Sequence, residues 1–279
     1  MGGASPKEHQ VIWTIMPFVD LWDSYTHRAA LDVLEQTEPT RLLLINNGSG
    51  DEDREKAERF AAERHPRVLL WSHDPQLPAL NECWNRALDF CWKVGAEKVW
   101  VCNNDARFSK HTLMTLSQAM DDTGALFVSA VGVGEGQFDP AEVPCYGKEE
   151  WDSLLQHRGG PDFSCFLISK EGHKKYRLDP NLTYAGDCDL HRQYMLGGDA
   201  KRIFSVNVPY LHYASRTINR SEEALEAHHR VNRRHLEYYE KKWGGRPNQE
   251  TFRHPFAGDA TNMDMGEEGI TNPELQARG

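Results

Sequence analysis

Between residues 11 and 133 the chain alternates short apolar runs with longer amphipathic segments, and this pattern restricts its fold more than any other feature. Strand-like runs occur at 11–16, 41–45, 68–71, 98–102 and 125–133, and helix-like segments lie between them at 24–36, 51–64, 80–94 and 111–120. Strands that alternate with helices in this way pair in parallel and are covered on both faces. The sequence therefore predicts an α/β domain with a mostly parallel sheet and helices on both faces.

The second half of the chain continues less regularly. Residues 135–161 have the Gly, Pro and acidic content of a long loop, and the pattern then predicts strands at 163–169 and 202–208, a helical turn at 170–176, and helices at 186–195 and 221–243. We expect one domain over 10–215, with halves 10–134 and 160–215. A C-terminal helical extension over 216–245 and a polar tail over 246–279 follow it. The tail is expected to be disordered or to dock on a partner subunit, so association of copies through the helix or tail is left open.

Bulk composition narrows the function classes. The formal charge of −10 disfavours a protein that coats nucleic acid by neutralising phosphates. An acidic protein that binds a nucleotide diphosphate needs a cation at that site. No window approaches the ~18 to 20 apolar residues that span a bilayer, the first ten residues lack the apolar region of a signal peptide, and the six cysteines form no CxxC pair. We therefore expect no membrane span and a cytoplasmic location.

The strongest local feature is Asn103-Asn104-Asp105, which follows the apolar run KVWVC directly. In open α/β sheets, ligands bind at the carboxyl ends of the strands, so a carboxylate placed there is poised to meet a ligand or a metal ion. The plain alternative is a turn that caps the next helix, because Asn and Asp favour both roles.

Taken together, the order of the segments and their motifs resembles the GT-A glycosyltransferases, specifically the large family 2 group. In the first half the resemblance rests on a strand ending in Pro17, the turn Asn46-Asn47-Gly48-Ser49, the helical Trp84-Asn85-Arg86-Ala87-Leu88, and Asn103 to Asp105 in place of the Asp-x-Asp metal motif. In the second half it rests on Gly160 to Glu171, Gly186-Asp187-Cys188-Asp189-Leu190, the Val-Pro strand that ends in His212, and Lys242-Trp243-Gly244. The resemblance covers about Val11 to Gly245. Asn46 and Gly186 stand where the family has acidic residues.

The resemblance implies a Rossmann-like GT-A domain that binds a nucleotide-diphosphate sugar and transfers the sugar with inversion to an acceptor hydroxyl. It implies that Asp105 and His212 hold Mn²⁺ or Mg²⁺. It also implies that Asp187 is the base, with Asp189 as the alternative base. The implied donor-binding residues lie at strand ends and on the third helix: Pro17, Asn46, Asn47, Asn85, Asn103 and Asn104. A UDP-sugar is the expected donor, although Asn46 in place of the acid changes how the base is read.

Other interpretations stay open at this point. A nucleotidyltransferase shares such a sheet, but Pro17 to Trp22 lacks the Gly-rich phosphate loop that it needs. A degenerate, non-catalytic sugar-binding module is also possible, because Asn46, Asn103 and Gly186 stand where the family has acidic residues. The acceptor is also open: a polysaccharide or lipid-linked sugar, a protein, a small molecule or a modified nucleic-acid base. A DNA acceptor would need a basic face, for which the candidates are Arg216, Arg220, Arg230, Arg233 and Arg234.

Overall fold

The computed structural model describes residues 11–77, 79–137, 139, 161–213 and 222–259, and these residues are built around one eight-stranded sheet. The strand order is β3-β2-β1-β4-β7-β6-β8-β5. The strands are β1 Ile12–Phe18, β2 Thr40–Asn46, β3 Val68–Ser72, β4 Lys98–Cys102, β5 Ala106–Arg107, β6 Phe127–Val133, β7 Cys165–Ser169 and β8 Ile203–His212. The helices are η1 Trp22–Thr26, α1 His27–Leu34, α2 Asp51–Glu63, α3 Leu80–Lys93, α4 Thr112–Thr123, α6 Lys170–Lys175, α7 Gly186–Leu196, η2 Ala200–Arg202, α8 Glu222–Trp243 and η4 Pro255–Gly258. The predicted α/β class with a mostly parallel sheet is confirmed.

The parallel half of the sheet consists of β1 to β4. β1 pairs in parallel with both β2 and β4, and it is buried along its whole length. We expected this strand to end at Pro17, but it runs on to Phe18. Proline is tolerated there because β4 pairs with β1 only as far as Ile15, so the missing N–H removes no bond on that side.

The other half of the sheet consists of β7, β6, β8 and β5. β7 runs antiparallel between β4 and β6, so that its first residue, Cys165, lies opposite Cys102, the last residue of β4. β8 is parallel to β6 and continues beyond the predicted end at residue 208. Its last two residues pair antiparallel with β5, a two-residue strand that the sequence pattern did not predict.

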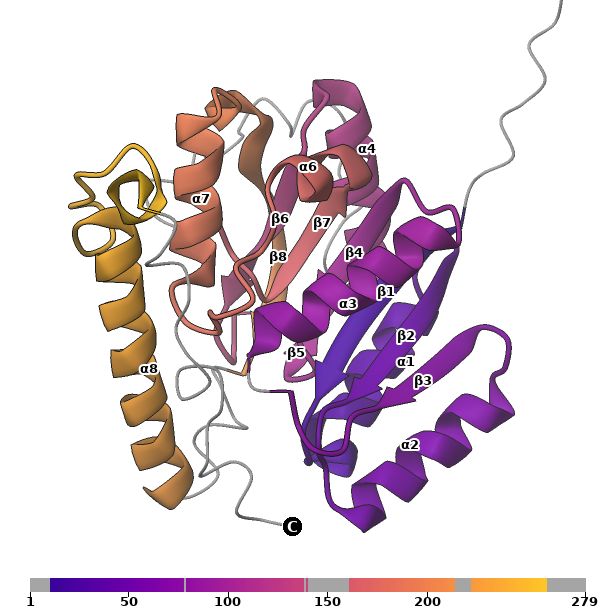
Figure 1. Cartoon of the computed structure of the whole chain (residues 1–279). Helices are drawn as coiled ribbons and strands as arrows, with labels where there is room; N and C mark the ends of the chain where they lie inside the picture. The colour runs from indigo at the N-terminus through magenta and orange to yellow at the C-terminus, as the bar shows by residue number, and fades with distance from the viewer. Residues whose placement is uncertain (1–10, 78, 138, 140–160, 214–221, 260–279) are drawn as a thin grey trace, which may run out of the picture.

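Helices cover both faces of the sheet, as the alternating pattern predicts. One core lies between the sheet and the helices α1, α2 and α4, with Phe60 and Leu116 among its residues. The other lies beneath α3 and α7, with Trp84 and Tyr194 among its residues. Figure 1 shows α7 and α8 on the side of the molecule opposite α2 and β3.

A third, smaller core joins α8 to the domain. It contains Leu182, Tyr238, Tyr239, Trp243 and Phe256. The expected polar tail does not begin directly after the helix, because residues 245–259 fold back on α8 of the same chain: the N–H groups of Thr251 and Phe252 donate to the carbonyl of Trp243. None of the helices within the described ranges is long and apolar enough to cross a membrane.

Candidate active site

Asp105 and His212 meet at the carboxyl edge of the sheet, 107 positions apart in the chain. Asp105 Oδ1 lies 3.5 Å from His212 Nε2, and the two side chains are 7% and 25% exposed. The register of β5 and β8 brings them together, because Ala106 pairs with His212. The N–H of Tyr213 also donates to the carbonyl of Asp105, at 3.0 Å.

The Asp105–His212 pair is the candidate metal site. His212 Nε2 is buried and makes no well-aligned hydrogen bond within the described part of the chain. Two atoms that each lie about 2.1 Å from one ion stand roughly 3.0–3.5 Å apart, which matches the observed separation. Burial alone lowers the pKa of His212, but the neighbouring carboxylates of Asp105 and Asp162 raise it above its ordinary value. The described residues hold no third His, Cys, Asp or Glu within reach of the pair, so the rest of a coordination shell would fall to substrate and water.

Asp162 is a carboxylate at this edge that sequence reasoning missed. The hydroxyl of Tyr210 donates to its Oδ2 at 2.7 Å, and the N–H of Ser164 donates to its Oδ1 at 2.8 Å. Its charge acts on both His212 and Asp187. Asp162 precedes β7 in a segment without periodic pattern, and the pairing of β7 with β4 brings this segment to the carboxyl end of β4.

Asp187 lies in the first turn of α7, where the charge of Asp162 acts on it. Burial is the main cause that raises the pKa of its carboxyl, and Asp162 adds to the effect. A carboxylate with a raised pKa is a stronger base at neutral pH. The residue before the helix, Ala185, has a left-handed backbone with φ of 58°. That conformation costs a non-glycine residue about 1 kcal/mol, and such strain gathers at functional sites.

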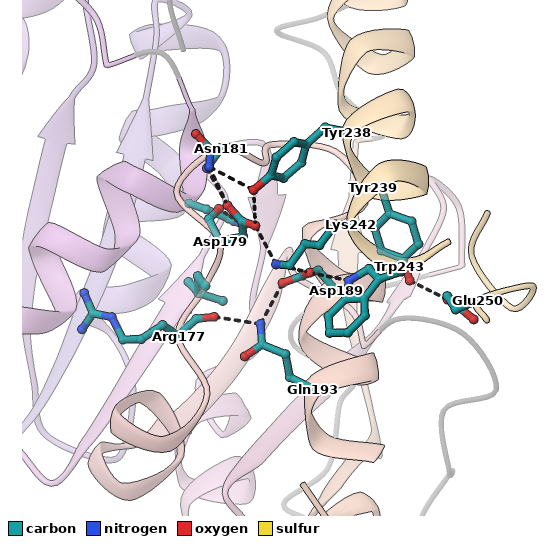
Figure 2. Close-up of polar contacts among 12 residues, drawn as sticks. Arg177, Asp179, Asn181, Asp189, Gln193, Tyr238, Tyr239, Lys242, Trp243 and Glu250 are labelled. Carbon is teal, nitrogen blue, oxygen red and sulfur yellow. Dashed lines mark hydrogen bonds and ion pairs between the residues drawn. The ribbon is translucent and has the colours of Figure 1, made fainter. Parts of the chain in front are cut away.

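Asp189, two residues further on, faces away from this edge. It is 0% exposed, and its carboxylate binds Lys242, Trp243 and Gln193 (Figure 2). Residues two apart on a helix point about 200° from each other. The charge of Asp162 thus acts on Asp187, whereas Asp189 binds Lys242 and Trp243 of α8.

Asn103 and Asn104, which precede Asp105, are held by two different segments, the one before β7 and η1. The side chain of Asn104 donates to Thr26 Oγ1 at 2.9 Å, and the backbone N–H of Asn103 donates to the carbonyl of Ser164. Asn104 is buried, whereas Asn103 is half-buried at the edge.

The ends of β1 and β2 form the neighbouring part of the edge. Asn46 Oδ1 accepts the N–H of Ser49 at 2.8 Å, which closes the turn after β2. Ser49 Oγ in turn accepts the N–H of Asp20 at 2.7 Å and so ties this turn to the segment after β1. Pro17 is buried within β1. Asn47 Oδ1 accepts the N–H of Leu77 at 2.9 Å, which anchors the segment after β3.

Asn85 lies in α3, and both polar atoms of its amide have protein partners. Its Nδ2 donates to the carbonyl of Leu178 at 2.8 Å, and its Oδ1 lies 2.9 Å from His173 Nε2. The indole N–H of Trp92 donates to the other ring nitrogen of His173 at 2.8 Å, so Nε2 must carry the proton given to Asn85. Asn85 thus holds α3 against the segment that leads to α7.

The proposed basic face is only partly described. Arg233 and Arg234 are exposed on α8, and Arg230 pairs with Glu226 at 3.8 Å. Arg216 and Arg220 lie outside the described residues.

Comparison with known proteins places the fold. No family model and no curated protein matches the sequence. Among solved structures, S. aureus TarS (residues 1–349) matches with a TM-score of 0.55 and 13% identity over 73% of this chain. A mannosyltransferase from Pyrobaculum calidifontis, in complex with GDP-Man and Mn²⁺, matches with a TM-score of 0.55 and 16% identity over 81% of this chain. GalNAc-T7, in complex with UDP, GalNAc and Mn²⁺, matches with a TM-score of 0.56 and 12% identity over 73% of this chain.

The fold is that of the GT-A glycosyltransferases. The chain covers 60%, 61% and 44% of the TarS, mannosyltransferase and GalNAc-T7 chains respectively, which is less than two thirds of each. At 12% to 16% identity the likeness establishes the fold. The chemistry must therefore be argued from this chain's own residues.

Proposed function

We propose that this chain is a metal-dependent glycosyltransferase that moves a sugar from a nucleotide-diphosphate sugar, a UDP-sugar by preference, to an acceptor hydroxyl with inversion. One observation carries the proposal: Asp105 and His212 stand 3.5 Å apart at the carboxyl edge of a GT-A sheet, with Asp162 acting on both His212 and Asp187. A nucleotidyltransferase or a non-catalytic sugar-binding module would give different results in the experiment below.

Asp105 and His212 are the residues that would hold the ion. A bound Mn²⁺ or Mg²⁺ supplies positive charge for the diphosphate that departs. Asp105 gives it a hard oxygen ligand and His212 a nitrogen ligand, a mixed set that suits Mn²⁺ at least as well as Mg²⁺.

The donor would lie along the ends of β1, β2 and β4. Pro17, Asn46 and Asn47 form its base and ribose side, and Asn103 and Asn104 its side toward the metal pair. Asn85 supports this arrangement from within α3, because its amide is occupied by Leu178 and His173.

Asp187 would take the proton of the acceptor hydroxyl. As the acceptor oxygen forms its bond to the anomeric carbon, the bond from that carbon to the diphosphate oxygen breaks on the opposite face, and the configuration inverts. A positioned carboxylate contributes roughly 10²- to 10⁴-fold to such a step. Asp187 is favoured over Asp189 because the carboxylate of Asp189 is fully buried and is bound by Lys242, Trp243 and Gln193.

The test combines binding with turnover. We expect Mn²⁺ with one member of a panel of UDP-, GDP- and dTDP-sugars to raise the melting temperature and to be followed by release of the nucleoside diphosphate. Asp105→Ala should abolish the metal-dependent shift. Asp187→Asn should keep the shift and lose roughly 10²-fold or more of the release.

Asp121→Asn is the matched control, because Asp121 pairs with Lys98 at the start of β4, the edge opposite the site. Stabilisation by nucleoside triphosphates but by no sugar nucleotide would favour the nucleotidyltransferase. Binding of a sugar nucleotide without any turnover would favour the sugar-binding module. An Asp187→Asn variant with full turnover would show that the base is another residue.

A further inference from the structure

Lys242, near the end of α8, is a buried lysine with two carboxylate partners. Its side chain is 9% exposed, and its Nζ lies 2.6 Å from Asp179 Oδ2 and 2.6 Å from Asp189 Oδ1 (Figure 2). Burial by itself lowers the pKa of Lys242, but Asp189 and Asp179 raise it above its ordinary value, so the amine stays charged. The last turn of α8 therefore holds a fixed positive charge between the segment before α7 and the first turn of α7.

Both carboxylates are held by further donors. Asp189 Oδ1 also accepts the indole N–H of Trp243 at 2.8 Å, and Asp189 Oδ2 accepts Gln193 Nε2 at 2.8 Å. Asp179 Oδ2 also accepts the hydroxyl of Tyr238 at 3.0 Å, and its Oδ1 accepts the N–H of Asn181 at 2.9 Å. Each contact has a direction, so the network fixes where the two carboxylates point.

Stability alone is a weak reason for this network. One lysine against two buried carboxylates leaves an excess negative charge, and apolar residues of similar volume commonly serve as well or better in such places. A network of directed contacts supplies a fixed orientation, which apolar packing defines less sharply. The element it orients is the first turn of α7, where Asp187 stands.

The geometry of the helix transmits this orientation to Asp187. Asp187 and Asp189 share the first turn of α7 and point about 200° apart, so an anchor on Asp189 sets the direction of Asp187. On the other side of the turn, Asn81 Nδ2 donates to the carbonyl of Asp179 at 3.1 Å and packs directly against Gly186. The turn is thus fixed from α8 and from α3.

We propose that Lys242 is a positioning residue for the transfer reaction: by binding Asp189 and Asp179 it holds α7 in the orientation that presents Asp187 to the acceptor hydroxyl. The inference rests on the proposed function, because it assigns a role to a residue that acts through the proposed base. Lys242 itself does not touch substrate.

The test uses Lys242→Met, with Lys241→Met as the matched control on the exposed face of the same helix. The probe is Mn²⁺ with the sugar nucleotide that stabilises the wild-type chain, and the readout is diphosphate release below the melting temperature of every variant. A displacement of about 1 Å at the base can cost about 100-fold in rate. We therefore expect kcat of Lys242→Met to fall by about that factor, while KM for the sugar nucleotide and the metal-dependent thermal shift stay close to those of the wild type.

A second variant keeps the inference testable if Lys242→Met does not fold. Trp243→Phe removes the N–H that donates to Asp189 and keeps the aromatic packing, and a smaller fall in kcat at unchanged KM is expected. If Lys242→Met folds and keeps the wild-type kcat, the inference is overturned and the proposed function stands. If Lys242→Met does not fold, a wild-type kcat of Trp243→Phe has the same consequence. A wild-type chain that binds no sugar nucleotide, or releases no diphosphate, overturns both.

Discussion

Gly186, which stands where the resemblance expects Glu, has no room for a side chain. A Cβ at this position would lie 2.6 Å from Asn81 Nδ2 and 3.2 Å from Asn81 Oδ1. Asn81 is 0% exposed and cannot swing into solvent. We predict that Gly186→Ala destabilises the protein, although alanine is the better helix former.

The magnitude follows from three contributions. Forcing a methyl group into a packed site costs about 1–3 kcal/mol. Displacing Asn81 weakens its 3.1 Å bond to the buried carbonyl of Asp179, and a buried group left without a partner costs about 1–3 kcal/mol. The higher helix propensity of alanine offsets up to about 1 kcal/mol of this cost. The net expectation is a loss of about 1–5 kcal/mol in the free energy of unfolding.

Urea denaturation at 25 °C, followed by tryptophan fluorescence and circular dichroism, measures this loss. Gly134→Ala is the matched control, because the nearest atom to its added Cβ is Gln137 Oε1 at 3.9 Å, and its effect should stay within about 0.5 kcal/mol. The double variant Asn81→Ala/Gly186→Ala should lose at least about 1 kcal/mol less than the sum of the two single variants, since the clash disappears with the Asn81 side chain.

The reasoning about this contact would be refuted by either of two results. One is a Gly186→Ala variant that is as stable as the wild type or more stable. The other is additivity of the two substitutions within about 0.3–0.5 kcal/mol, which would mean that the two positions do not touch.

Two further predictions concern buried charge. Burial lowers the pKa of both His173 and His235 to about 4, and each ring nitrogen Nδ1 accepts N–H bonds that a second proton would break. The unfolded chain takes up these protons below pH 6.5, and the folded chain takes them up only near pH 4. As the pH falls from 6.5 to 4, the free energy of unfolding measured in urea should therefore fall by about 3 kcal/mol per histidine. A free energy of unfolding that does not change over this pH interval would contradict the prediction. Arg107→Met should cost about 1.5–3 kcal/mol, because Asp32, whose carboxylate lies 2.6 Å from Arg107 Nε and is 3% exposed, loses one charged donor and keeps Arg28 at 3.2 Å. Asp32→Asn in the same background should recover part of the loss in the same assay.

Much of the fold can be predicted from the sequence, because the strands and helices have strong periodic patterns. The strand predicted at 98–102 has those bounds in the structure, and most others differ by one to three residues. β5 was missed, since two residues carry no period. The last strand was predicted too short, because its end is formed by pairing with β6 and β5 rather than by its own composition.

The candidate site divides in the same way. Motif order singled out Asp105, Asp187 and His212, and it expected an acidic residue at the position of Gly186. It gave no sign of Asp162, and it suggested for Asn85 a donor-binding role, whereas its amide partners are Leu178 and His173.

The order and type of the elements follow from local sequence, because hydrophobic periodicity and turn residues act over a few neighbouring positions. Which side chains meet depends on the three-dimensional arrangement of these elements. The pairing of Ala106 with His212 sets the spacing of the Asp105–His212 pair. The packing of α8 on α7 brings Lys242 into an ion pair with Asp189. Such meetings depend on strand register and on the packing of segments distant in the chain, and no local pattern of residues encodes either.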